Sequence, residues 1–160
     1  MSFITKEKSV ALYAALVSFG TYVFIFGFRK SFTVCTFEGM TFGPIAFKTA
    51  MVISQMLGYL MAKFYGIKFI SGLEKQHRYK IIFLLTGIAW AAWLLFAVVP
   101  APYSILFLFI NGFPLGMLWG VVFSYVEGRK STDFIGAALA VSFIFSAGWV
   151  KSVGGWLMLQ

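Results

Sequence analysis

Basic residues inside long apolar segments are the groups in this sequence whose chemistry most needs an explanation. Arg29 and Lys30 follow the apolar run of residues 10–28, and Lys151 interrupts the apolar run of residues 134–159. A charge near the centre of a bilayer costs from ~3 to more than ~10 kcal/mol. Such a cation therefore extends to the membrane surface or faces a polar cavity. We expect Arg29 and Lys151 to line a cavity.

A second polar stripe lies on the otherwise apolar segment 45–67. At 100° per residue on a helix, four of its polar side chains fall within about 80° of one another. They are Lys48, Gln55, Tyr59 and Lys63. On the first segment, the helical i, i+4, i+7, i+11 spacing places four residues on one face, namely Tyr22, Phe26, Arg29 and Thr33. The alternative for Lys48 and Lys63, which lie toward opposite ends of their segment, is that each reaches the surface.

Cations that converge cannot satisfy one another, so water, a counter-ion or an anionic ligand must complete the site. The planar guanidinium of arginine matches a phosphate or a carboxylate group. His77 and Cys35 are the only histidine and cysteine, and no acidic residue lies in the middle of an apolar segment. We therefore expect no metal site, no cofactor and no enzymatic nucleophile–base pair.

The composition predicts an all-α protein that crosses a membrane several times. Of the 160 residues, 61% are hydrophobic and only 11% are charged, and the mean hydropathy is +0.90. A soluble domain carries about 25% charged residues. Because a spanning helix needs about 20 residues, we expect a polar leader (residues 1–9) and a transmembrane domain (10–160) with five helices, at about 10–35, 45–67, 81–99, 103–126 and 134–159.

The distribution of Lys and Arg predicts the orientation. Eight lie in the leader and in alternate loops: Lys6, Lys8, Lys68, Lys75, Lys80, Arg78, Arg129 and Lys130. The opposite loops, 36–44 and 100–102, hold none. Short cytoplasmic loops are enriched in these residues, so we expect a cytoplasmic amino terminus, in the inner membrane of a bacterium. The net charge of +8 is explained by this pattern, and we expect the lipid bilayer rather than a nucleic acid as partner.

Three segments resemble a known family of transporters. The run Tyr22–Phe32 is similar to the first helix of the organophosphate:phosphate antiporters of the glycerol-3-phosphate type, where aromatic residues lead into Arg-Lys-x-Phe. Residues 59–66 and 150–155 resemble that family's second and fifth helices. Short outer loops, a basic second-to-third loop and a fourth span with Gly112, Gly116 and Gly120 resemble the amino-terminal half of the major facilitator superfamily.

The resemblance implies secondary transport of a small organic anion, such as a phosphate ester, by alternating access. It assigns Arg29 as the principal anion ligand, with Tyr59, Lys63 and Lys151 around the same cavity. Tyr22, Lys30 and Gln55 are further candidates. The glycines of the fourth span are expected to pack closely against another helix, with Asn111 donating across the interface.

The sequence departs from the family in two places. The second-to-third loop lacks the usual Asp and has only Glu74, and Lys151 replaces a histidine. An uncharacterised bacterial multi-pass family with the same architecture is therefore the other interpretation, and a non-transporting sensor or scaffold is the alternative function. Since the superfamily has six helices per half, we expect this chain to be a piece of a longer transporter that lacks its carboxy-terminal helices.

Overall fold

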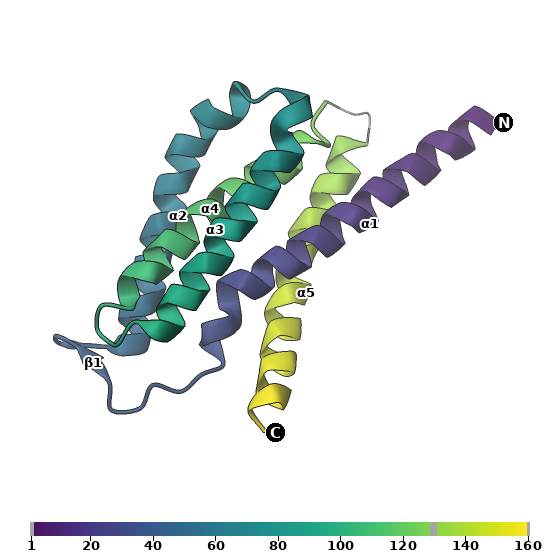
Figure 1. The fold of residues 1–160 in the computed structure, drawn as a ribbon. Helices are drawn as coiled ribbons and strands as arrows, with labels where there is room; N and C mark the ends of the chain where they lie inside the picture. The colour runs from purple at the N-terminus through teal and green to yellow at the C-terminus, as the bar shows by residue number, and fades with distance from the viewer. Residues whose placement is uncertain (1, 129–130, 160) are drawn as a thin grey trace. The chain divides into compact units, whose positions relative to one another are not determined.

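The computed structural model describes residues 2–128 and 131–159, with side chains from residue 8 onward except residue 75, and these ranges are mostly helical (Figure 1). The described elements are five α-helices, two 3-10 turns and one hairpin. The helices are α1 (Ser2–Lys30), α2 (Phe47–Ser71), α3 (Arg78–Val98), α4 (Ile105–Ser124) and α5 (Thr132–Met158). The turns are η1 (Ser31–Thr33) and η2 (Lys75–His77), and the hairpin pairs β1 (Thr41–Phe42) with β2 (Ile45–Ala46).

Four apolar segments of the described chain are long enough to cross a membrane. They are Lys8–Thr33, Arg78–Val98, Ile105–Ser124 and Thr132–Met158. The prediction of an all-α protein with the character of a multi-pass membrane protein is confirmed at this level. The expected second span also forms a helix, α2, but it is not among these four, and it carries Lys48, Lys63 and Lys68.

The amino-terminal boundaries differ from those expected from the sequence. Residues 1–9 were predicted to be a separate leader, but α1 already begins at Ser2. The physical reason is that lysine and glutamate are good helix formers and that the first glycine of the chain is Gly20. At the other end, α1 stops at Lys30 and η1 continues to Thr33, so the apolar segment that could span a membrane includes Arg29 and Lys30.

A short β-hairpin lies between α1 and α2, at the end of the expected loop 36–44 and the start of the expected second span. Thr41 pairs with Ala46 and Phe42 with Ile45, so that Gly43 and Pro44 form the two-residue turn. Gly43 has a φ of 58°, a left-handed conformation that glycine adopts without strain. Of the eight loop cations used to predict the orientation, Arg129 and Lys130 lie outside the described residues.

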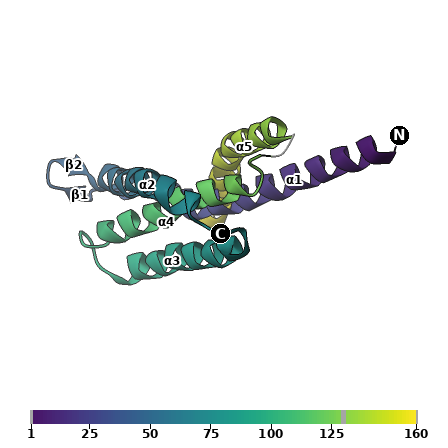
Figure 2. The ribbon, with the colours of Figure 1, turned by 90° about the horizontal axis from the view of Figure 1, so that it is seen from above.

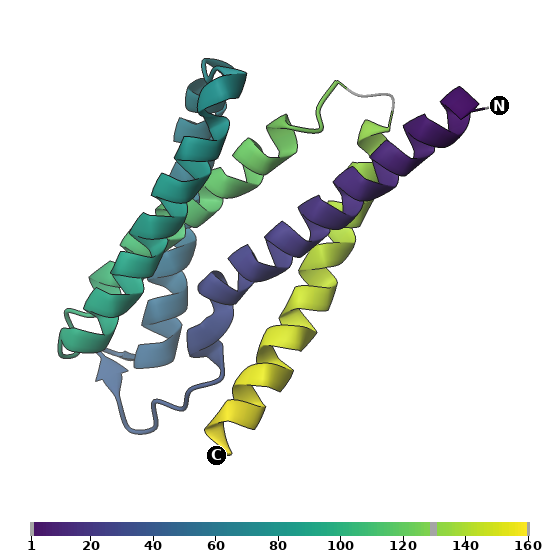
Figure 3. The ribbon, with the colours of Figure 1, turned by 45° about the vertical axis from the view of Figure 1, so that its right-hand side comes forward.

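The chain forms two compact units, each described by itself. Unit 1 contains α1, η1, α5 and the last residues of α4, and unit 2 runs from Cys35 to Val121 and contains the hairpin, α2, α3 and most of α4. In unit 1, α1 and α5 lie side by side and run in the same direction (Figure 3). Contacts along the pair have a nearly constant separation of about 120 residues: Ala15 with Ile135, Tyr22 with Phe143, and Val34 with Gly154.

In unit 2 the backbones of α2 and α4 touch at glycines, as predicted from the spacing of Gly112, Gly116 and Gly120, which we call the glycine stripe. A Cβ added at Gly112 would overlap the carbonyl oxygen of Gln55, and one at Gly116 would lie 2.7 Å from the Cβ of Ala62. Small residues allow this approach of two helices in a membrane protein. The expectation that the glycine stripe packs against another helix is confirmed, and the partner is α2.

Asn111 joins the three helices of unit 2, with α4 between α2 and α3 (Figure 2). Its Oδ1 accepts a hydrogen bond of 2.9 Å from the Nε2 of Gln55 on α2, and its Nδ2 donates one of 3.0 Å to the carbonyl oxygen of Ala89 on α3. Both amide side chains are buried. Buried polar groups are costly unless they are hydrogen-bonded, so these two bonds favour one arrangement of the three helices.

Candidate anion-binding site

Three cations come together at the end of the α1/α5 pair, and we call Arg29, Lys30 and Lys151 the cation cluster. Arg29 and Lys30 are consecutive, and Val34, four residues after Lys30, contacts Gly154, three residues after Lys151. Arg29 and Lys30 are half-buried, whereas Lys151 is exposed. Like charges at this range repel one another, and the repulsion increases as the surroundings become less polar.

The close approach of α5 to the residues after α1 positions the cation cluster. A Cβ added at Gly154 would lie 2.5 Å from the Cγ2 of Val34, so only glycine fits there without displacing its neighbour. Because α1 and α5 are parallel with a constant register, the contact between Val34 and Gly154 also brings Lys30 and Lys151 to the same level.

The end of α1 is a favourable position for the positive charges of Arg29 and Lys30. Arg29 and Lys30 lie in its last turn, where the helix dipole favours positive charge. The hydroxyl of Thr33 donates a hydrogen bond of 2.6 Å to the carbonyl oxygen of Lys30 and so stabilises the end of the helix. The helix dipole does not favour Lys151 in this way, because seven residues of α5 follow it and it does not lie in the last turn.

The carboxylates of unit 1 lie far from the cation cluster along the helices. The acidic residues of α1, α5 and the segment before α5 are Glu7, Glu127 and Asp133. Asp133 is in the first turn of α5. It precedes Lys151 by 18 residues, which is about 27 Å along a helix. Lys6 and Lys8 lie with Glu7 near the start of α1, whereas Arg29, Lys30 and Lys151 lie toward the other ends of their helices, away from the acidic residues of the pair.

Tyr22, a further predicted site residue, contributes to the packing of the same helix pair. Its side chain is 2% exposed, and its ring centroid lies 4.6 Å from that of Phe143 on α5. Phe26, one turn later, meets the same ring edge-on at 6.2 Å. Tyr22 and Phe26, two residues of the face of α1 that was predicted to hold Arg29, therefore pack against Phe143 of α5.

The predicted site residues of unit 2 are engaged with neighbours inside that unit. The ammonium group of Lys63 lies 5.0 Å from the ring centre of Tyr59 and 4.5 Å from that of Trp119 on α4, an arrangement that attracts a cation to both rings. Gln55 donates to Asn111. Lys48 donates a hydrogen bond of 3.0 Å to the carbonyl oxygen of Cys35.

Trp119 was not among the predicted site residues, and Lys30 was one of the further candidates. Trp119 directly precedes Gly120 of the glycine stripe. The stripe predicted that another helix packs against α4, but it did not identify the tryptophan ring that faces Lys63. Lys30 lies about 100° from Arg29 around the helix, which argued for a separate face. The structure nevertheless places Lys30 within electrostatic range of Lys151.

The fold and its composition define the class of the molecule, an all-α protein with the character of a multi-pass membrane protein and with a cation cluster at one end of a parallel helix pair. The chain belongs to a family of unknown function (DUF5690), whose model matches residues 31–160. The matched region begins at η1 and includes α2 to α5. No curated protein and no solved structure matches the chain.

Proposed function

We propose that the protein is a secondary transporter that binds a small organic anion at the cation cluster and moves it across the membrane by alternating access. The charged group of the substrate is a phosphate ester or a carboxylate. The observation that carries this proposal is the gathering of Arg29, Lys30 and Lys151 on two paired helices whose segments are apolar enough to span a membrane. The similarity of the run Tyr22–Phe32 to the first helix of the organophosphate:phosphate antiporters also supports it.

The electrostatics favour an anion over any other small ligand. Arg29 and Lys30 lie in one segment apolar enough to span a membrane and Lys151 lies in a second, and a cation at such a position favours negative charge or water nearby. Arg29 supplies a fork of N–H donors that can hold two oxygens of one phosphate or carboxylate group. Lys30 and Lys151 supply compact positive charge. The site binds and orients the anion and carries out no covalent chemistry.

In this proposal the substrate changes its access from one side of the membrane to the other when helix bundles rock around the bound anion. The second bundle comes from further helices of the same protein or from a second copy. Unit 2 moves as one body, because its helices are joined by the glycine stripe and by Asn111.

In the same proposal, the amino terminus is cytoplasmic, and the membrane is the inner membrane of a bacterium. Tyr59 and Lys63 are further ligand candidates from the resemblance.

Flux into proteoliposomes tests this function. We expect purified full-length protein to exchange internal for external labelled anion with at least one of phosphate, glycerol 3-phosphate and succinate, and we expect Arg29→Gln and Lys151→Gln to abolish the exchange. Lys8→Gln is the matched control, because Lys8 is an exposed cation near the opposite end of α1, and it should retain wild-type flux.

Two outcomes would contradict the proposal in different ways. Anion binding that depends on the cation cluster but produces no exchange would favour the sensor or scaffold alternative. Neither binding nor exchange would mean that the cations extend to the membrane surface and hold no ligand.

A further inference from the structure

The connection between α2 and α3 carries a dense positive charge that the proposed transport does not use. Four cations lie within 13 residues, Lys68 near the end of α2, Lys75 in η2, and Arg78 and Lys80 in the first turn of α3. Lys68 and Lys80 are exposed. We call these four residues and the short segment between them the basic connection.

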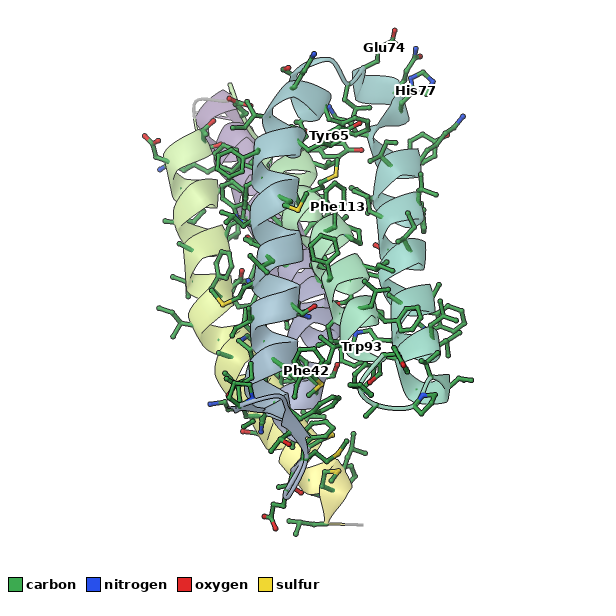
Figure 4. The ribbon with its side chains drawn as sticks, turned by 90° about the vertical axis from the view of Figure 1, so that its left-hand side faces the viewer. Phe42, Tyr65, Glu74, His77, Trp93 and Phe113 are labelled. Atoms are coloured by element: carbon green, nitrogen blue, oxygen red, sulfur yellow. The ribbon has the colours of Figure 1, made fainter. Side chains whose placement is uncertain are left out.

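The single carboxylate of the basic connection is already engaged. Glu74 Oε2 accepts a hydrogen bond of 2.6 Å from the Nε2 of Gln76 and lies 3.4 Å from the Nδ1 of His77. Figure 4 shows Glu74 and His77 at one end of unit 2, with Phe42 of the hairpin at the other end. The basic connection holds four basic residues and one acidic residue, so its formal charge is positive.

The length of the apolar part of α3 determines the depth at which these cations lie in a bilayer. Arg78–Val98 is apolar enough to cross a membrane, and its uninterrupted apolar part begins at Ile81, directly after Lys80. The 18 residues from Ile81 to Val98 extend about 27 Å as a helix, close to the ~30 Å thickness of the hydrocarbon layer. When α3 spans the bilayer, Arg78 and Lys80 must lie in the head-group layer.

The aromatic residues beside these cations fit the same depth. Tyr79 is 52% exposed, and the ammonium group of Lys80 lies 6.0 Å from its ring centre. Tyr65, one turn before Lys68 on α2, is 58% exposed and stacks on Phe69. Tyrosine is enriched where the apolar layer meets the head groups, because its ring is apolar and its hydroxyl is polar.

We propose that the basic connection is a binding surface for the head groups of anionic phospholipids. A lipid phosphate is held at the depth of these cations by its own acyl chains, which cover the apolar faces of the helices. A soluble anion has no such anchor, and exposed lysines alone hold it weakly. Clusters of four or more Lys and Arg beside a membrane helix attract anionic lipid through the surface potential. This surface belongs to unit 2 and does not depend on the cation cluster.

Lipid binding to the purified full-length protein tests this inference. Native mass spectrometry in detergent would compare phosphatidylglycerol with phosphatidylcholine of the same acyl chains. We expect wild type to prefer phosphatidylglycerol, and we expect the preference to fall about fivefold for each cation removed, hence about 25-fold in K68Q/K80Q. Higher salt should reduce it as well, because exposed charges are screened. Lys48→Gln, at the opposite end of α2, is the control and should keep the wild-type preference.

Equal binding of the two lipids, or a preference that K68Q/K80Q leaves unchanged, would overturn the inference. Inorganic phosphate that displaces phosphatidylglycerol at comparable concentration would overturn the assignment to lipid, because the ligand would then be a soluble phosphate group. Since Lys68 and Lys80 are exposed, the melting temperature of K68Q/K80Q should match that of wild type, and this measurement separates lost binding from lost folding.

Discussion

The two units of the chain use different chemistry to hold their helices together. In unit 2, backbones touch at the glycine stripe and two buried amide side chains join three helices. In unit 1, aromatic rings interleave between α1 and α5, and the buried hydroxyls of Ser142 and Ser146 donate to carbonyl groups of their own helix. Arg29, Lys30 and Lys151 lie near the contact between Val34 and Gly154, toward one end of this pair.

Two polar stripes that look alike in the sequence have different neighbours in the structure. On α2, Gln55 and Lys63 contribute to packing, one through an amide partner and the other between two rings. On α1, Arg29 and Lys30 meet a third positive charge.

The largest expected effect is on the helix contact of unit 2. In Gly112→Ala the new methyl group would overlap the backbone of Gln55, and because the helices must separate to make room, we expect a loss of about 3 kcal/mol of stability or more. Thermal unfolding in detergent would measure it. Gly87→Ala on α3, with no atom within 4 Å of the added Cβ, is the control and should be neutral or slightly stabilising. Equal stability of the two variants would refute the close contact.

The amide network of unit 2 should give the next largest effect. Asn111→Leu keeps the size of the side chain but removes both hydrogen bonds, and it leaves the amide of Gln55 buried. We expect a loss of about 1–2 kcal/mol. The double variant with Gln55→Leu should lose less than the sum of the two single variants, because the two residues share one bond. Strictly additive losses in thermal unfolding would show that Gln55 and Asn111 do not interact.

Unit 1 should tolerate an added methyl group better than unit 2. In Gly154→Ala the new Cβ meets the side chain of Val34, which can shift, rather than backbone. We expect a loss of about 1 kcal/mol, together with weaker anion binding because α5 moves away from Lys30. Gly155→Ala, with open space around its Cβ, should keep both properties. A larger loss at Gly154 than at Gly112 would reverse the comparison between the units.

An effect of similar size to that of Gly154→Ala is expected at Lys63. Its cation–π contacts with Tyr59 and Trp119 contribute about 0.5–1 kcal/mol each when partly exposed. Lys63→Met should therefore lose about 1 kcal/mol, whereas Lys63→Arg should retain most of the stability because it keeps the charge. If Lys63→Met instead abolishes anion exchange without changing thermal unfolding, Lys63 is a ligand, as the resemblance implied.

The sequence predicted the features that depend on periodicity and composition. Long apolar runs indicated the helices, and the four-residue spacing of the glycine stripe predicted a close helix contact. It did not predict which helix would be the partner, since that depends on long-range packing that one sequence does not reveal. The sequence predicted a polar leader over residues 1–9 and a first span from about residue 10; the helix α1 begins at Ser2, because lysine and glutamate continue a helix well.

The sequence predicted only part of the candidate site, because the rest depends on contacts between helices. Arg29 and Lys151 were identified from the cost of charge in an apolar segment, which needs no neighbours to evaluate. The parallel register of α1 and α5 brings Lys30 near Lys151, and helical angles on α1 alone could not show this. The rings around Lys63 likewise come from two helices, so their joint arrangement was beyond any single-helix pattern.

Anion binding to the cation cluster is the most direct test of the account. A ligand at 100 times its dissociation constant adds about 2.7 kcal/mol to stability, so a thermal-shift titration of the full-length protein with phosphate, glycerol 3-phosphate and succinate would detect it. We predict stabilisation of wild type and of Lys8→Gln, and none of Arg29→Gln, Lys30→Gln or Lys151→Gln. Stabilisation that persists in all three cluster variants, or that no anion produces in wild type, would contradict the account.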